Sequence, residues 1–150
     1  MRRSGRLSVA LHVLMHMAER PEDPMTSERM ARWADGNPVV IRRSFAGLRE
    51  AGILSSSRGH GGGWVLAKPL DQITLADVQQ ALDEPIVALA EPSDNPQCLV
   101  ERAVNSELHD VFREAERLVL ERMRRVTLAD LRARFDGRNL SDFIHPGDPA

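Results

Sequence analysis

Two short stretches contain side chains whose types and spacing suggest a binding function. In both stretches the group that could bind a ligand is the guanidinium of arginine. The segment 37–52 has an apolar stripe at positions i, i+4 and i+7. Off that stripe lie its three arginines, Arg42, Arg43 and Arg49. The second stretch is the glycine-rich run 58–63, which contains Arg58 and His60. Because a guanidinium group can bind phosphate or guanine through two parallel hydrogen bonds, both stretches indicate a surface for a polyanion.

Local signals predict that 37–52 forms one helix with its arginines on the outside. Asn37 is a good N-cap, and Pro38 suits the first helical position, where the missing N–H costs no intrahelical bond. Gly52 can adopt the left-handed conformation that ends a helix. A short helix with basic residues near its N-terminus is typical of a reader of the DNA major groove. An ordinary amphipathic helix with a solvated basic face has the same pattern.

The residues before this helix supply the rest of a helix-turn-helix. An apolar pattern predicts a first helix over 7–19, and a second is expected from a hydroxyl cap at Ser27 to about residue 34. A turn that contains Gly36 then leads into 37–52, and two short helices joined in this way form the motif. The expected contacts between the two helices involve Met30, Trp33, Ala34, Ile41 and Phe45.

After Gly52 the pattern changes to short β runs over 53–57 and 64–67, which predict a hairpin with 58–63 at its tip. Glycines at the tip permit close approach of the backbone to another surface. A nucleotide phosphate loop is excluded, because no Gly-Lys-Ser/Thr follows and the glycines do not open a helix. A hairpin "wing" beside a basic helix suits a DNA duplex, and Arg58 is placed to enter a minor groove.

A long helix, predicted over about 97–125, is the main feature of the second half. It follows a shorter helix capped by Thr74 and a proline-containing loop over 83–96. The long helix exceeds what one small core can cover, so we expect it to pair with its copy in a second subunit. An intrachain hairpin with a last short helix near 127–135 is the alternative. The expected dimer contacts are Val104, Leu108, Val111, Phe112, Ala115, Leu118, Val119 and Met123.

Charge is divided between the two halves of this 150-residue chain. Residues 1–70 hold 11 Lys and Arg against 6 Asp and Glu, whereas residues 71–150 hold 9 against 16. The formal net charge of −2 conceals this division. A basic front half and an acidic back half indicate a polyanion-binding module joined to something else.

Other function classes lack the residues that they need. No Ser/His/Asp grouping, carboxylate pair beside a glycine-rich site or metal-ligand cluster stands out, which argues against an enzyme. His12 and His16 are spaced i, i+4 but lack the Glu of a His-Glu-x-x-His zinc site, so two ordinary histidines are expected rather than a metal site. No apolar run approaches a membrane span, and the N-terminus makes a poor signal peptide, so the cytoplasm is the expected location.

These motifs together resemble the IscR/NsrR-type (Rrf) bacterial transcriptional regulators over about residues 5–135. The matching stretches are 7–12, 37–43, 48–54, 58–67 and 73–78. The resemblance implies a homodimer bound to double-stranded DNA at a pseudo-palindromic operator, usually as a repressor, with the recognition helix and the wing on the DNA. The candidate DNA-binding residues are then Ser27, Asn37, Val39, Val40, Arg42, Arg43, Arg58, Gly59, His60 and Gly61.

The sequence departs from the family pattern at the cofactor. Well-known members hold an iron–sulfur cluster on three cysteines before the long helix, and this chain has only Cys98. A cluster needs several ligands, and Asp94 and His109 add too few, so we expect no iron–sulfur cluster and no other cofactor. The chain resembles the cluster-less members more closely. Three roles stay open for Cys98: a small buried hydrophobe, a redox-sensor thiol, or a ligand of a metal or cofactor.

The expected fold is mostly α with a small β-hairpin wing. It divides into a winged helix-turn-helix DNA-binding domain (1–83), a loop (84–96), dimerisation helices (97–135) and a flexible tail (136–150). The expected function is a dimeric, sequence-specific DNA-binding transcriptional regulator, a repressor that responds to redox change or to a small molecule. The alternative is a winged-helix module that binds protein and not DNA.

Overall fold

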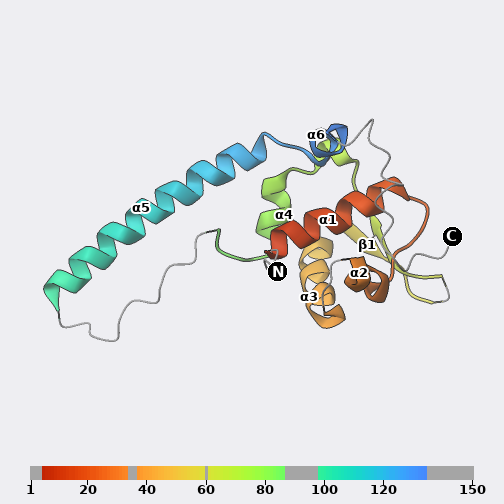
Figure 1. Cartoon of the computed structure of the whole chain (residues 1–150), viewed down its shortest axis with the longest axis horizontal. Coiled ribbons are helices and arrows are strands. Elements are labelled where there is room, and N and C mark those ends of the chain that lie inside the picture. Colours follow the sequence, from red (N-terminus) through yellow and green to blue (C-terminus); the bar gives the residue numbers. More distant parts are fainter. Residues whose placement is uncertain (1–4, 34–36, 60, 87–97, 135–150) are drawn as a thin grey trace.

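A computed structural model describes residues 5–33, 37–59, 61–86 and 98–134 (Figure 1). The described part is mostly helical with one two-stranded antiparallel hairpin, which confirms the predicted winged helix-turn-helix and long C-terminal helix. The predicted tail 136–150 and most of the predicted loop 84–96 lie outside it. In chain order the elements are α1 (Arg6–Glu19), α2 (Ser27–Trp33), α3 (Pro38–Glu50), β1 (Leu54–Ser56), β2 (Trp64–Leu66), the 3₁₀ turn η1 (Leu70–Gln72), α4 (Leu75–Ala81), α5 (Leu99–Arg124) and α6 (Leu128–Ala133).

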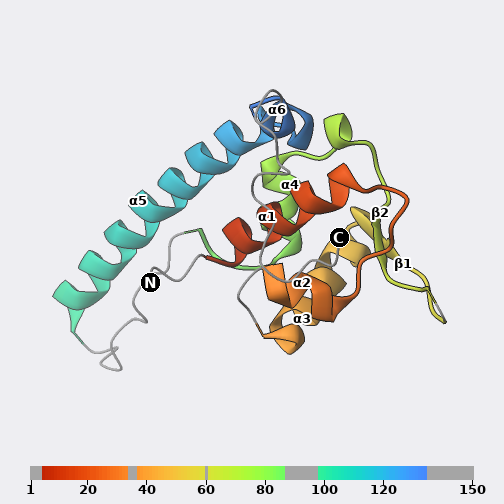
Figure 2. The same ribbon diagram turned by 45° about the vertical axis from the view of Figure 1, so that its right-hand side comes forward.

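One hydrophobic core joins the N-terminal elements. Helix α1 contacts α3, α4 and β2, and Figure 2 shows these elements gathered around it while α5 extends away. Met30, Ile41 and Phe45 are buried in the same cluster, as predicted for the contact between α2 and α3. The Trp33 side chain and Ala34, expected in that contact, lie outside the described residues.

Helix α3 begins and ends near the residues that were predicted to cap it. The Asn37 side-chain oxygen accepts a hydrogen bond from the Val39 backbone N–H at 2.8 Å, and Pro38 is the first helical residue. After the helix, Gly52 has φ +70°, the left-handed conformation predicted for it. The predicted stripe is buried and includes one polar residue, Ser44.

Gly47 lets α3 approach α4 closely. A Cβ atom at this position would lie 2.1 Å from the Ala81 carbonyl oxygen at the end of α4. That is far inside van der Waals contact, so only glycine fits the observed crossing. The position of α3 against α4 therefore depends on a residue that the periodicity of the helix does not single out.

The hairpin is fixed to the helix-turn-helix through Met25. Strands β1 and β2 pair with Leu54 opposite Leu66. Met25 and Trp64 exchange two backbone hydrogen bonds, each 2.9 Å long, which add a third segment beside β2. The Trp64 indole N–H donates to the Ser27 hydroxyl at 3.2 Å. These contacts set the wing at a fixed place relative to α2.

The cap of α2 differs from the expectation. Thr26, not Ser27, accepts a hydrogen bond from the Arg29 backbone N–H, at 3.3 Å. Ser27 is the first helical residue and is buried. Its hydroxyl accepts the hydrogen bond from the Trp64 indole. Thr26 and Ser27 both carry a hydroxyl that could cap α2. The contact with Trp64, which is distant in sequence, occupies Ser27 and leaves Thr26 as the cap.

Helices α5 and α6 are placed differently from each other. None of the residues of α5 is buried, whereas Leu128 of α6 is fully buried in the core of the N-terminal unit. The Leu128 backbone N–H donates to the Ile73 carbonyl at 2.8 Å, and the Leu75 N–H donates to the Val126 carbonyl at 2.9 Å. The sequence predicts 97–135 as one dimerisation unit, whereas in the structure α6 packs on the winged-helix side.

Candidate nucleic-acid interface

Helix α3 has an inward face and an outward face of opposite character. Ile41, Phe45 and Leu48 point inward and are buried. The side chains on the outward face are exposed, and they include Val39, Val40, Arg42, Arg43 and Arg49, together with the acidic Glu50 at the helix end. An ordinary amphipathic helix with a solvated basic face has the same exposure, so the surroundings of α3 decide what this face can do.

Arg42 is held by a carboxylate from the neighbouring helix. Its guanidinium forms an ion pair with Glu28 in the first turn of α2, and both side chains are more than half exposed. A hydrogen bond from its own backbone amide is the largest cause that lowers the pKa of Glu28, and the charge of Arg42 adds to it. Exposed pairs of this kind contribute little stability, so Arg42 can exchange Glu28 for a phosphate or a base at small cost.

The tip of the wing exposes backbone and charge together. Arg58, Gly59 and Gly61 are exposed, and the two glycines have φ values of +102° and +78° that favour glycine. The turn is closed by a 3.0 Å hydrogen bond from the Gly62 N–H to the Gly59 carbonyl. His60 lies outside the described residues. Because α3 also contacts β1, the basic helix and the hairpin belong to one packed unit.

The remaining candidate DNA-binding residues divide into one that is exposed and one that is not. Asn37 is exposed, although its side-chain oxygen is engaged as the cap of α3. Ser27 is buried against Trp64, so its side chain is not part of the exposed surface formed by α3 and the wing.

A set of polar contacts among three side chains behind α3 was not predicted from the sequence. The Arg6 side chain, at the start of α1, donates to the Ser44 hydroxyl from two nitrogens at 3.2 Å each. The same guanidinium lies 2.6 Å from a Glu84 carboxylate oxygen. Ser44 is buried on the inner face of α3, so this link fixes the recognition helix to α1 and to the segment that follows α4. The signal was a serine within an otherwise apolar stripe.

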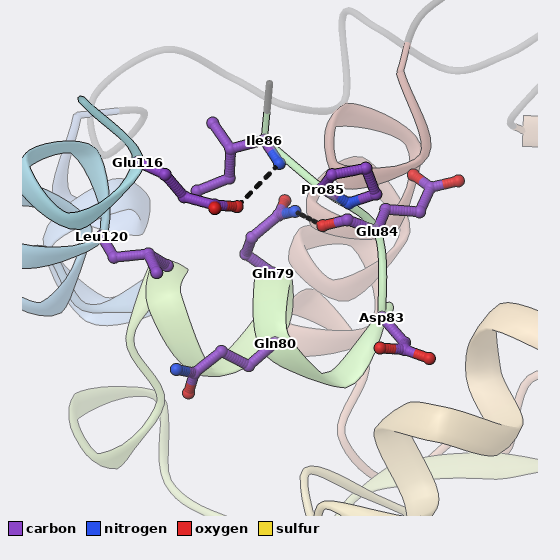
Figure 3. Close-up of a pocket in the computed structure, with 8 residues that line it drawn as sticks. All are labelled: Gln79, Gln80, Asp83, Glu84, Pro85, Ile86, Glu116 and Leu120. Carbon is purple, nitrogen blue, oxygen red and sulfur yellow. Dashed lines mark hydrogen bonds between the residues drawn. The ribbon is translucent and has the colours of Figure 1, made fainter. Parts of the chain in front are cut away.

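The segment after α4 also lines a pocket of about 340 Å³ beside α5 (Figure 3). The Gln79 side-chain amide donates to the Glu84 carbonyl at 2.7 Å, and Glu116 of α5 accepts from the Ile86 backbone N–H at 3.2 Å. Leu120 closes one side. These bonds hold α4, the segment after it and α5 together, and they are structural contacts rather than a catalytic grouping.

The other predicted residues lie on α5 and α1. Cys98 is the exposed N-cap residue of α5, which contradicts its reading as a buried hydrophobe in this single chain. His12 and His16 stack with ring centroids 4.8 Å apart, with a 2.9 Å contact between their Nε2 atoms. Of the predicted dimer residues, Phe112, Ala115 and Met123 are half-buried. The exposed ones are Val104, Leu108, Val111, Leu118 and Val119.

The helix pair α2–α3 and the attached hairpin define a winged helix-turn-helix protein. The family model Rrf2, described as an iron-dependent transcriptional regulator, matches residues 3–134. The chain belongs to the Rrf2 family, and it is a DNA-binding transcriptional regulator rather than an enzyme.

Individual relatives agree with this assignment. The chain is 31% identical over 130 residues to the HTH-type protein YwnA of Bacillus subtilis, covering 85% of this chain and 95% of YwnA. It is 29% identical over 128 residues to the HTH-type transcriptional regulator CymR of the same organism, covering 85% of this chain and 86% of CymR. A crystal structure of a Lactobacillus plantarum protein matches with a TM-score of 0.73 and 25% identity over 91% of this chain and 93% of that one.

No helix within the described ranges is long and apolar enough to cross a membrane.

Proposed function

We propose that this chain is a homodimeric repressor that binds a pseudo-palindromic operator through α3 and the wing. The observation that carries the proposal is the outward face of α3, where Arg42, Arg43 and Arg49 are exposed, and the hairpin that packs against α3 has Arg58 exposed at its tip. Helix α3 would enter the major groove, and Arg58 would enter the adjacent minor groove. Repression would follow from occupation of the operator.

The dimer is proposed from α5. Its exposed apolar residues recur at helical spacing over several turns, from Leu99 and Val100 through Val104, Leu108 and Val111 to Leu118. A stripe of this length, framed by charged residues, is typical of a helix that pairs with another helix. Two copies related by a two-fold axis would present two recognition helices, which fits an operator with two related half-sites.

We propose that the regulator works without an iron–sulfur cluster, although its family is described as iron-dependent. The available ligand side chains do not fit a cluster. The chain has one cysteine, Cys98, and His109 lies eleven residues after it, about 16 Å away along α5 at 1.5 Å per residue. Among the residues that the structure describes, no three His, Cys, Asp or Glu side chains are grouped to hold a metal ion. Asp94, the third donor considered from the sequence, lies outside those residues.

Cys98 is the proposed sensor of redox change. An exposed thiol beside the first turn of α5 is accessible to peroxide, which oxidises a thiolate to a sulfenic acid and is itself reduced to water. Cys98→Ser would then keep operator affinity and lose any release of DNA by hydrogen peroxide. An unchanged peroxide response in the variant would remove Cys98 from the proposal.

The test of DNA binding is fluorescence anisotropy with the full-length protein at two salt concentrations. The duplexes are the region upstream of its own gene, operators selected from random sequence, and a scrambled control. Specific binding that weakens with salt is expected, because phosphate contacts release counterions. Arg58→Ala should cost about 1–3 kcal/mol of binding free energy, whereas Arg134→Ala, at the end of α6, is the matched control with little effect. A folded dimer without sequence preference would favour a protein-interaction module instead.

A further inference from the structure

The first turn of α3 carries an exposed apolar pair that arginine–phosphate contacts do not explain. Val39 is 67% exposed and Val40 is 49% exposed. Single exposed valines are common on protein surfaces. These two are adjacent, and they stand one helical turn before the exposed Arg42 and Arg43 on the same outward face. The pair therefore lies inside the basic surface rather than apart from it.

The two side chains are held in place before any ligand binds. The Asn37 cap fixes the Val39 backbone N–H, and the Pro38 ring restricts φ at the helix start. A valine in a helix has one strongly preferred χ1 rotamer. Their methyl groups are consequently rigid projections at the end of the helix that enters a groove.

Resting on the proposed function, we infer that Val39 and Val40 recognise the C5-methyl groups of thymines in the operator half-site. In the major groove, thymine is the base that presents a methyl group, whereas the other base edges present hydrogen-bonding atoms. A valine placed over such an atom would take away its water and return no hydrogen bond. The ligand of this apolar patch is DNA, because the negative charge of a duplex complements the positive charge of the surrounding arginines.

Recognition of thymine methyl groups fixes part of the operator sequence. Each half-site has thymine where the N-terminal turn of α3 enters the groove. Phosphates or guanines lie within reach of Arg42 and Arg43 one turn further along the helix. Val39 and Val40 are thus specificity-determining residues, and the arginines supply most of the affinity.

The experiment replaces single thymines of a selected operator by uracil, which removes only the C5-methyl group. For the wild-type dimer, uracil at one or two positions of the half-site should weaken binding about fourfold, the equivalent of one buried methyl group. Val39→Ala or Val40→Ala should bind the thymine operator more weakly and lose the distinction between thymine and uracil at the corresponding position. Arg58→Ala is the matched control, because it should weaken binding to both duplexes by the same factor.

The outcomes separate this inference from the proposed function. If specific, salt-dependent binding is found but uracil has no effect, or the same effect in the valine variants as in wild type, the thymine inference is overturned and the repressor proposal stands. If no duplex is bound specifically, the proposed function fails and the inference fails with it. Because both valines are exposed, alanine should leave thermal unfolding unchanged, and a melt of each variant checks this.

Discussion

Helices α3 and α5 have similar amphipathic patterns and opposite surroundings. The stripe of α3 is buried by α1, α2 and α4 within the chain, whereas α5 has 26 residues and none of them is buried. Leu48 of α3 is 0% exposed, and Leu118 of α5 is 53% exposed. Periodicity therefore identifies an apolar face, but it does not identify what covers that face.

The difference has a physical cause in length and connection. Helix α3 is 13 residues long and is joined on both sides to elements that pack on it. Helix α5 is about 39 Å long at 1.5 Å per residue, which exceeds the reach of the small core beside it. Its apolar stripe can be buried only by another polypeptide, and we propose that a second copy of the chain buries it.

The largest expected effect comes from the same truncation made in the two helices. Leu48→Ala should lower the free energy of unfolding by about 2–5 kcal/mol, because it leaves a cavity in a packed core. Leu118→Ala should change the unfolding of dilute, monomeric protein by less than about 0.5 kcal/mol. Urea unfolding at several protein concentrations measures both. An equal loss for Leu118→Ala in the monomer would show that α5 is packed within its own chain.

The next prediction concerns the dimer alone. Leu108→Asp places a charge on the exposed stripe and should raise the dimer dissociation constant at least about a hundredfold, equal to about 2.7 kcal/mol. Ser106→Asp introduces the same charge on another face of α5 and is the control. Analytical ultracentrifugation gives the association constant, and circular dichroism checks that helix content is kept. A Leu108→Asp protein that remains as dimeric as the control would place the interface elsewhere.

Much of α3 could be predicted because its signals are local. The Asn37 cap, the Pro38 start and the Gly52 end each depend on neighbours in sequence, and all three are confirmed. The role of Ser27 could not be predicted, since it is set by Trp64, 37 residues away in sequence. The Arg6–Ser44–Glu84 link escaped for the same reason.

The candidate site divides along similar lines. Residue types and spacing were enough to predict that Arg42, Arg43 and Arg58 are exposed. They were not enough to predict the ion pair of Arg42 with Glu28, because that contact depends on the angle between α2 and α3. The placement of α6 on the winged-helix core was also missed, since a short amphipathic helix has no sequence signal for which neighbour it joins.

A glycine substitution tests the packing of the recognition helix. Gly47→Ala should destabilise the protein by about 1–3 kcal/mol, because the new methyl group meets the Ala81 carbonyl and forces α3 away from α4. Alanine is the better helix former by up to about 1 kcal/mol, so the loss reports the clash and not helix propensity. Gly5→Ala is the control, since nothing lies within 4 Å of a Cβ there. Thermal unfolding that is equal in the two variants would contradict the close crossing of α3 and α4.

The smallest expected effect is a pH dependence at the start of α6, and it tests whether that short helix shares the stability of the winged-helix core. Hydrogen bonds from the Thr127 backbone N–H, and then from its hydroxyl, hold the pKa of Asp130 below its ordinary value of 3.8. Because the folded pKa is lowered, this contribution to stability is present above the unfolded pKa and is lost as pH falls through the folded one. Asp130→Asn should therefore be less stable than wild type at about pH 6, and the difference should shrink towards about pH 2. Asp110→Asn removes an exposed carboxylate from α5 and is the control for net charge. A difference for Asp130→Asn that is the same at both pH values would mean that the capping box is not coupled to folding of the core.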